Sequence, residues 1–393
     1  MRTQKGDGHV IAYLEGRIDS SNAAAVQAEL EAARAQNPGL ELVIDAGALA
    51  YISSAGLRSL LKVRKDQGSL AVREASPEIY EIFDMTGFTS ILSVTKKLRE
   101  LSVDGCEIVG RGAIGTVYRI DEDTIVKVYE LPDSLPMIEN EQRRAKQAFL
   151  KGIPTAISYD VVKVGEKYGS VFEMLKATTF NDVLIASPEK RDTIVEDYAR
   201  LIRQVHEVEM DRGELPEAKA VYLGYLDDLR DLLDEALYAR LRAMFEAMPE
   251  NLHVVHGDLQ MKNVMLSGNE PMLIDMDTLS VGDPVFDLMD LFLAYALFNE
   301  DEPDNSMKFL GITNEMCDFI YEKTLACYFA DRDAAEIRDA EKKIRIVACV
   351  RFLFLLAVLG IGLPELKQIR IEHTLEHLRE LVPQVDSLEV AKK

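Results

Sequence analysis

The sequence predicts a two-domain protein in which a small α/β sandwich precedes a larger α+β domain. Its 393 residues allow two or three domains, each with its own core. Strand-like and helix-like segments alternate over the first ninety residues, which is typical of a layered α/β fold. Residues 1–100 hold 12 basic and 13 acidic residues, although the whole chain carries a net charge of −22. We therefore expect domains at 1–101 and 107–393, joined by a linker at 102–106.

The first domain is built from short segments whose periodicity changes between two and about 3.6 residues. The expected elements, in chain order, are an edge strand at 9–19, a helix at 23–35, a strand at 40–45, a helix at 57–63, a strand at 70–72 and a helix at 78–85. No GxGxxG pattern follows any of these strands. A nucleotide site is therefore not expected in this domain.

Two serines, Ser53 and Ser54, lie where the second of these strands leads into a helix. A hydroxyl at this position can cap the helix by accepting a backbone N–H bond. A phosphate would also be tolerated, because it meets exposed N–H groups and the positive end of the helix dipole. The spacing alone favours the cap and leaves Ser54 as a candidate phosphoacceptor.

Residues 8–100 resemble an anti-sigma-factor antagonist (STAS) domain. The resemblance rests on LEGRIDSSNA, LELVIDAGALAYISSAGLRSLL and IFDMTGFTSIL. It implies that a partner kinase phosphorylates the serine before the small-small-Leu turn, Ser54, and thereby switches off binding to an anti-sigma factor or another STAS-binding partner. Many members of the family carry Asp just before the acceptor serine, where this chain has Ser53.

A glycine-rich segment opens the second domain with the pattern GxGxxGxVY between two β-like runs. Its marked positions are Gly110, Gly112, Gly115 and Val117. Glycines at this spacing let the backbone cover a triphosphate, although a plain glycine-rich hairpin is the alternative. The next strand, 125–128, places Lys127 among β-branched residues. Packing explains such a lysine poorly, whereas a cation that reaches the phosphates explains it well.

About 130 residues later the chain reads HGDLxxxN, with Asp258 and Asn263 five positions apart. An apolar strand then ends in Asp275 and Asp277. Phosphoryl transfer needs a cover over the phosphates, a lysine, an aspartate beside the nucleophile and oxygen ligands for magnesium. All four occur in the right chain order. This ordered set predicts an ATP- and Mg²⁺-dependent phosphotransferase that acts on an alcohol group.

Residues from about 105 to 393 resemble the kinase-like phosphotransferases of the aminoglycoside phosphotransferase and choline kinase branch. HGD in place of HRD, and IDMDTLSVGDPVFDL, distinguish that branch from ordinary protein kinases. The resemblance implies a bilobal, protein-kinase-like fold, with an N-lobe at about 107–176 and a C-lobe at about 177–393. ATP and Mg²⁺ are the implied cofactors.

The resemblance also implies roles for individual residues. Lys127 would contact the ATP phosphates, and Asp258 would be the base or orienting carboxylate for the acceptor hydroxyl. Asn263 and Asp275 would hold Mg²⁺. The partner of Lys127 would come from an acidic helix, on which Glu141 is preferred and Glu139 stays open.

Further positions follow from the same resemblance. The strand and hinge at 171–175 would pair with adenine, which places Glu173 and Leu175 at the nucleotide. Asp277 would approach the metal. Asp283 and Asp287 would brace the loop, and His206 would support the catalytic loop structurally.

Three functions remain open for the acceptor side. In the first, the enzyme phosphorylates a small amino sugar or amino alcohol, which the acidic surplus suits, and the STAS domain regulates it. In the second, it is a protein kinase that acts on Ser54 in cis or on a STAS partner in trans. In the third, the domain binds nucleotide without turnover and serves as a signalling scaffold. The intact set of motifs argues against the third function, and the short segment 275–287 weakens the second.

The composition excludes other classes of protein. A chain with 45 basic and 67 acidic residues lacks the positive field that nucleic acids or anionic lipids require. The four cysteines have no CxxC spacing, so reduced thiols are expected. The most apolar stretch, 344–362, is interrupted by Arg345 and Arg351 and is expected to be a buried helix. With no secretory signal at its start, the protein is expected in the cytoplasm.

Overall fold

The computed structural model describes residues 1–6, 8–112, 115–131, 134–175, 177–268 and 270–391. The chain divides into two compact units, Met1–Ser102 and Val103–Lys393. Each unit has a hydrophobic core of its own. The second unit carries almost all of the net charge, because it holds 33 basic and 54 acidic residues.

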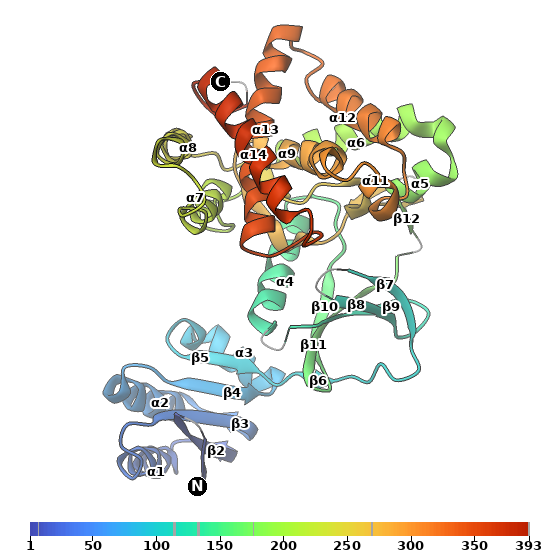
Figure 1. Ribbon diagram of the computed structural model, residues 1–393. Coiled ribbons are helices and arrows are strands. Elements are labelled where there is room, and N and C mark those ends of the chain that lie inside the picture. The colour runs from blue at the N-terminus through green and yellow to red at the C-terminus, as the bar shows by residue number, and fades with distance from the viewer. Residues whose placement is uncertain (7, 113–114, 132–133, 176, 269, 392–393) are drawn as a thin grey trace. The chain divides into compact units, whose positions relative to one another are not determined.

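The first unit is a five-stranded sheet with helices packed on it (Figure 1). Its elements are β1 (Arg2–Lys5), β2 (His9–Ile18), α1 (Ala23–Ala35), β3 (Glu41–Ile52), α2 (Ser54–Gln67), β4 (Ala71–Ala75), α3 (Pro77–Met85), η1 (Phe88–Ser90) and β5 (Ser93–Lys96). The strand order is β1-β2-β3-β4-β5. Strands β2 to β5 run parallel, and β1 pairs antiparallel with β2. The chain continues through the short strand β6 (Arg99–Glu100).

The segment 9–19 was expected to form an edge strand, and this predicted edge position is wrong. Strand β2 lies between β1 and β3, and β1 forms the edge. Every residue of β1 is exposed and its sequence, RTQK, has no apolar alternation, so the pattern could not reveal it. Burial alternates along the inner strand β3, where Leu42, Ile44 and Ala46 are buried and their neighbours are less so. Alternation of this kind shows that helices cover one face of the sheet, as in a two-layer α/β fold.

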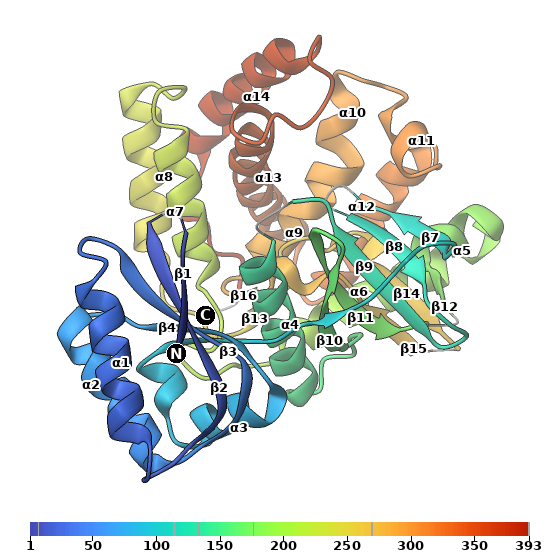
Figure 2. The same ribbon diagram turned by 90° about the horizontal axis from the view of Figure 1, so that it is seen from below.

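The second unit begins with an antiparallel sheet of the order β10-β11-β9-β8-β7 (Figure 2). Its elements are β7 (Glu107–Arg111), β8 (Gly115–Arg119), β9 (Thr124–Tyr129), α4 (Leu135–Leu150), β10 (Ser158–Val164) and β11 (Lys167–Glu173). Helix α4 packs against β10 and β11. Gly115 is required where β8 meets β9, because a Cβ there would lie 2.5 Å from the carbonyl oxygen of Val128.

The remainder of the unit is mainly helical. Its helices are α5 (Phe180–Ala186), η2 (Pro188–Lys190), α6 (Arg191–His206), α7 (Ala218–Asp228), α8 (Glu235–Ala247), η3 (Met261–Asn263), η4 (Met276–Thr278), α9 (Val285–Phe292), the π-helical η5 (Leu293–Leu297), α10 (Phe298–Glu300), α11 (Asn305–Phe309), α12 (Asn314–Tyr328), α13 (Ala334–Ala357), α14 (Lys367–Leu381) and η6 (Val382–Gln384). Its short strands are β12 (Ala177–Thr179), β13 (Val254–Val255), β14 (Val264–Ser267), β15 (Glu270–Leu273) and β16 (Ser280–Val281). They pair as β12-β14-β15 and β13-β16, and they carry the loops of the candidate site.

The apolar stretch at 344–362 forms the buried second half of α13, which ends at Ala357, before the predicted end. Within the described ranges, no helix is long and apolar enough to cross a membrane.

Candidate active site

Lys127, in the middle of β9, lies between two carboxylates that come from distant parts of the chain. Its Nζ is 3.5 Å from Oε1 of Glu141 on α4, and it also forms an ion pair with Asp275. Glu141 is buried and Glu139 is exposed, so the structure gives Lys127 the partner that the sequence preferred. Burial disfavours the charged ammonium, but these two carboxylates outweigh it and raise the pKa of Lys127. The lysine is therefore a fixed cation.

Asp258 lies on the loop that follows β13 and is held by Asn263. The Nδ2 of Asn263 donates to the backbone oxygen and to Oδ2 of Asp258, both at 2.9 Å. Gln260 donates to Oδ1 at 3.2 Å. Burial raises the pKa of Asp258, with His256 opposing the shift and the charge of Asp275 adding to it. A positioned carboxylate with a raised pKa is suited to accept a proton.

Asp275 and Asp277 follow β15 and face the same region. The φ angle of Asp275 is 66°, a left-handed conformation that Asp tolerates better than most side chains. Burial raises the pKa of Asp277 to about 6, and the charges of Asp275 and Glu141 contribute. The backbone carbonyl of Asp277 accepts a hydrogen bond from Arg144 of α4. Negative charge is thus concentrated in front of Lys127.

This arrangement fits a magnesium ion that is held partly by a nucleotide. The described residues include no group of three His, Cys, Asp or Glu side chains that could cage a metal alone. Mg²⁺ commonly binds through one or two protein ligands together with substrate phosphates and water. Since the Nδ2 of Asn263 faces Asp258, its Oδ1 can serve with Asp275 as such a ligand pair. Burial is the main cause of the raised pKa of Asp277, and the nearby charges of Asp275 and Glu141, which a bound cation would offset, add to it.

Asp287, near the start of α9, supports the loop that carries Asp258. Its carboxylate accepts the backbone N–H of His256 at 2.9 Å and that of Gly257 at 2.6 Å. It also pairs with Nε2 of His206 at 2.8 Å. Burial alone would raise the pKa of Asp287, but His206 and the backbone donor Gly257 lower it, so the group stays charged. Gly257 has a φ angle of 80°, which explains a glycine within HGD.

Three further residues hold this loop, and the sequence analysis missed them. Oδ2 of Asp290 accepts the N–H of Leu259 at 2.9 Å, and the hydroxyl of Tyr198 donates to the carbonyl of Leu259 at 2.5 Å. The hydroxyl of Tyr295, in η5, accepts the N–H of Met261 at 3.1 Å. A signal was present for Asp290, because it follows Asp287 by three residues on one helix and so shares its face.

Asp283 joins the segment after Asp275 to the C-terminal part of the chain. Its Oδ1 accepts the backbone N–H of Val285 at 2.9 Å and that of Val390 at 3.0 Å, and its Oδ2 accepts that of Ala391 at 3.0 Å. Asp283 therefore holds backbone groups of residues more than a hundred positions away. No local sequence pattern could indicate these partners.

The glycine-rich segment and the hinge, the two segments predicted to bind the nucleotide, include residues of the strands β8 and β11, which flank β9 and its Lys127. Val117 is paired with Lys127 across β8 and β9. Gly110 and Gly112 leave room for a Cβ, unlike Gly115, and the two residues between Gly112 and Gly115 lie outside the described residues. On the hinge, the exposed Glu173 ends β11, the N–H of Met174 donates to Asp123 at 2.8 Å, and Leu175 is half-buried.

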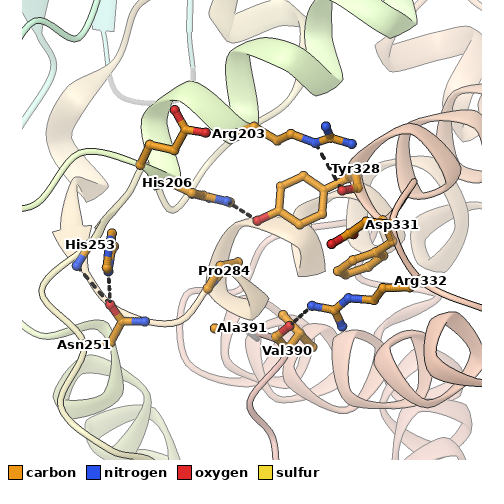
Figure 3. A pocket seen from close by; sticks show the side chains of 12 residues that line it. Arg203, His206, Asn251, His253, Pro284, Tyr328, Asp331, Arg332, Val390 and Ala391 are labelled. Atoms are coloured by element: carbon orange, nitrogen blue, oxygen red, sulfur yellow. Dashed lines mark hydrogen bonds between the residues drawn. The ribbon is translucent and has the colours of Figure 1, made fainter. Parts of the chain in front are cut away.

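A cavity of about 350 Å³ opens beside His206 (Figure 3). Its lining consists of Arg203, His206, Glu207, Asn251, His253, Pro284, Tyr328, Phe329, Asp331, Arg332, Val390 and Ala391. Asp258, Asn263 and Asp275 are not among these residues. The cavity is therefore distinct from the site formed by Lys127 and the acids. His206 links the two regions, because its ring bonds to Tyr328 in the lining of the cavity and to Asp287, which supports the loop of Asp258.

In the first unit, Ser53 and Ser54 have separate positions. The side chain of Ser53 caps α2 by accepting the N–H of Gly56 at 3.4 Å. Ser54 is the first residue of that helix and is exposed. The capping role thus belongs to Ser53, and the hydroxyl of Ser54 is accessible.

The two folds and the converging lysine, glutamate and aspartates define a kinase-like phosphotransferase with an N-terminal STAS unit. Residues 105–309 match the family described as phosphotransferase enzyme family, and residues 1–94 match the one described as Mlab, STAS domain. The chain belongs to the phosphotransferase enzyme family, and its first unit is a STAS domain.

The chain is also similar to individual proteins of known name or structure. A protein of Bordetella bronchiseptica named as an anti-sigma factor antagonist, BtrV, is 45% identical over 94 residues, which are 23% of this chain and 80% of that protein. A thermostable mutant of aminoglycoside phosphotransferase APH(4)-Ia, solved with ADP and hygromycin B, matches at a TM-score of 0.50 and 12% identity over 71% of this chain and 93% of its own. A choline/ethanolamine kinase family protein from Mesorhizobium loti matches at a TM-score of 0.45 and 15% identity over 70% and 87%. At 12% identity the APH(4)-Ia structure shows the fold alone.

Proposed function

We propose that the second unit transfers the γ-phosphoryl group of ATP to the hydroxyl of an acceptor, with Mg²⁺ as cofactor. The observation that carries this proposal is the convergence of Lys127, Asp258 and Asp275 from three separate segments, with Glu141 holding the lysine and Asn263 holding Asp258. Packing gives no reason for a cation and so many acids to meet at one place, whereas phosphoryl transfer requires them.

Each residue has a distinct task in this reaction. Asp258 accepts the proton of the acceptor hydroxyl, and the oxygen of that hydroxyl forms a bond to the γ-phosphorus of ATP. The bond between the γ-phosphorus and the β–γ bridging oxygen breaks at the same time, which releases ADP. Lys127 binds the nucleotide phosphates, and Asn263 and Asp275 would hold Mg²⁺. When bound, the metal neutralises charge on the phosphoryl oxygens. Gly110, Gly112 and Gly115 cover the phosphates, and the hinge at Glu173 and Leu175 receives the adenine.

In the first of two candidate functions, the acceptor is a small amino sugar or amino alcohol. The large acidic surplus of the second unit supports a cationic acceptor. The related APH(4)-Ia structure contains hygromycin B, and choline and ethanolamine appear in the name of another relative. The STAS unit would then regulate the enzyme or recruit an anti-sigma factor or another STAS-binding partner.

A second candidate function is a protein kinase that phosphorylates a STAS serine. The observation that favours it is the exposed position of Ser54, next to a cap that Ser53 already provides. A phosphate there would meet the N-terminal N–H groups of α2 without removing the cap. The acceptor would be Ser54 itself or the equivalent serine of a partner.

Incubation of the full chain with labelled ATP and Mg²⁺, with and without a metabolite pool, tests these functions. Mass spectrometry of the protein and of the pool then locates the label, with Asp258→Asn and Ser54→Ala as controls. Label on a metabolite supports the first function, and label on Ser54 that is lost in Ser54→Ala supports the second. ATP binding without transfer to either would contradict the first function and phosphorylation of Ser54 itself. The absence of transfer to an added STAS partner as well would favour a nucleotide-binding scaffold.

A further inference from the structure

Arg351 is a half-buried cation with no carboxylate of the described residues in ion-pair contact. It lies on α13 within the apolar run that forms the core of that helix. Its Nη1 donates to the hydroxyl of Tyr225, and its guanidinium is 5.2 Å from the centre of the Tyr225 ring. Among the residues that the structure describes, no ion pair involves Arg351. A guanidinium has five N–H donors, and no nitrogen of Arg351 is a buried atom without a partner, so the donors not bonded to Tyr225 are accessible to solvent or a ligand.

Helix α13, which carries this arginine, packs against the helix that supports the catalytic loop. Helix α13 contacts both α7, which carries Tyr225, and α9. On α9, Asp287 and Asp290 hold the backbone on either side of Asp258 through their hydrogen bonds to Gly257 and Leu259. The charge of Arg351 accordingly acts on Asp258, where it opposes the larger effect of burial.

A purely structural role would be to neutralise the buried Asp290. That carboxyl, however, already accepts the N–H of Leu259. Burial, together with the charge of Asp258, raises the pKa of Asp290 well above its usual range, and Arg351 opposes that rise. Burial disfavours the charge of Arg351, but Tyr222, Tyr225, Asp290 and Asp258 together raise its pKa. Neither carboxylate forms an ion pair with the guanidinium, so its other N–H groups are left for a ligand.

Aromatic rings pack around Tyr225, the residue that contacts the guanidinium of Arg351. The ring of Tyr225 is stacked on Phe354 with 3.9 Å between centroids, and Tyr222 lies edge-on against Tyr225 at 5.2 Å. A guanidinium supported by such a wall is preorganised, and its planar fork matches the two oxygens of a carboxylate or a phosphate.

We propose that Arg351 binds an oxyanion of the acceptor, a carboxylate or a phosphate, and so holds the acceptor hydroxyl at Asp258. This inference rests on the proposed phosphotransfer and narrows its acceptor to an alcohol that carries a negative group. An amino group on the same molecule would still suit the acidic surroundings. Arg351 is a specificity-determining residue in this scheme, because it distinguishes oxyanionic alcohols from neutral and purely cationic ones.

The test uses four small alcohols of similar size: D-glycerate, sn-glycerol 3-phosphate, glycerol and ethanolamine. Binding of each to the full chain with ADP and Mg²⁺ is measured by calorimetry, and phosphorylation of each is measured with labelled ATP. We expect one of the two oxyanionic probes to bind at least roughly tenfold more tightly than glycerol and ethanolamine, because charge-assisted bidentate bonds are strong. The glycerate and glycerol phosphate arms show whether the oxyanion is a carboxylate or a phosphate.

Variants then assign the preference to one side chain. Arg351→Gln should lose the preference, a drop of roughly 10- to 100-fold in affinity for the oxyanionic probe, and Arg351→Lys should restore only part of it. Arg345→Gln, on the same helix, is the matched control and should keep the preference. Circular dichroism checks that each variant is folded. If Arg351→Gln does not fold, the proposal is tested by comparing the preference for the oxyanionic probe in the native protein and in Arg351→Lys, which should show a weaker preference.

The inference is overturned if the native protein shows no preference for oxyanions, or if the preference survives in a folded Arg351→Gln protein. A failure of the proposed function is a different result. In that case the Arg351-dependent preference would be measured in binding, while no phosphoryl group would pass from ATP to any acceptor.

Discussion

At the scale of single residues, Asp275 combines an unusual backbone conformation with an ion pair to Lys127. If its carboxylate is a metal ligand, Asp275→Ala should lower Mg²⁺-dependent ATP turnover by about a thousandfold, the order expected when a major source of transition-state stabilisation is lost. The fold should remain, as circular dichroism would show. Asp304→Ala, on an exposed ion pair with Lys308, is the control. Unchanged turnover in a folded Asp275→Ala protein would remove Asp275 from the proposed metal site.

Asp277 gives a prediction about pH. Its pKa is raised to about 6 in the folded protein, from an ordinary value of 3.8. Between these values the folded state binds more protons than the unfolded state, so this group lowers stability progressively as the pH rises from about 4 to 6. Asp277→Asn lacks the ionisation and should be more stable than the native protein at pH 7, by on the order of 2 kcal/mol, but not at pH 4.

Urea unfolding in metal-free buffer at several pH values measures this difference. A gain in stability that is the same at pH 4 and pH 7 would mean that the carboxylate of Asp277 is not the titrating group.

The sequence indicated the residues whose chemistry is tied to a motif, such as Lys127, Asp258 and Asp275. It could not indicate Arg351, which lies about ninety positions beyond Asp258 and is recognisable only from the helix packing. Glu139 and Glu141 were separated by burial alone, because two acids two positions apart on a helix face different sides. Motifs therefore predict chemistry along the chain, and tertiary contacts determine which of the remaining polar groups are close to it.

At the scale of elements, β8 and β9 approach so closely at Gly115 that a methyl group cannot be inserted. Gly115→Ala would bring a Cβ to 2.5 Å from the backbone of Val128, which cannot move as a side chain can. We expect a loss of about 1–3 kcal/mol in stability and a weaker affinity for ATP. Gly110→Ala is the matched control, because its Cβ would meet Val117 at an ordinary 3.7 Å.

Thermal unfolding and nucleotide binding of both variants provide the measurement. Equal behaviour of the two variants would show that the β8–β9 approach does not restrict position 115.

Elements with clear periodicity were predicted closely, and the rest were not. The helix expected at 23–35 is α1, whereas the helix expected at 57–63 is longer, because α2 starts at its cap and continues to Gln67. Strand β1 was missed because both of its faces are exposed, which removes the apolar alternation that identifies a strand. Capping and edge positions depend on hydrogen bonds and neighbours rather than on hydrophobicity.

At the scale of the whole molecule, the division into two compact units predicts separate folding. A fragment of residues 1–101 contains the complete sheet and core of the first unit, so it should unfold cooperatively on its own. Circular dichroism during urea titration provides the measurement, with the full chain for comparison. A disordered fragment beside a folded full chain would show that the first unit depends on the second.

The concentration of negative charge in the second unit has a kinetic consequence. With 54 acidic and 33 basic residues, this unit repels an anionic nucleotide at long range, and within the candidate site it is the ammonium of Lys127 that attracts it. Salt shortens the reach of the repulsion from about 30 Å at 0.01 M to about 8 Å at 0.15 M. Stopped-flow measurements should therefore show that the association rate constant of a fluorescent ATP analogue increases with ionic strength. An enzyme with a basic entrance would show the opposite slope, since its steering is lost when salt is added.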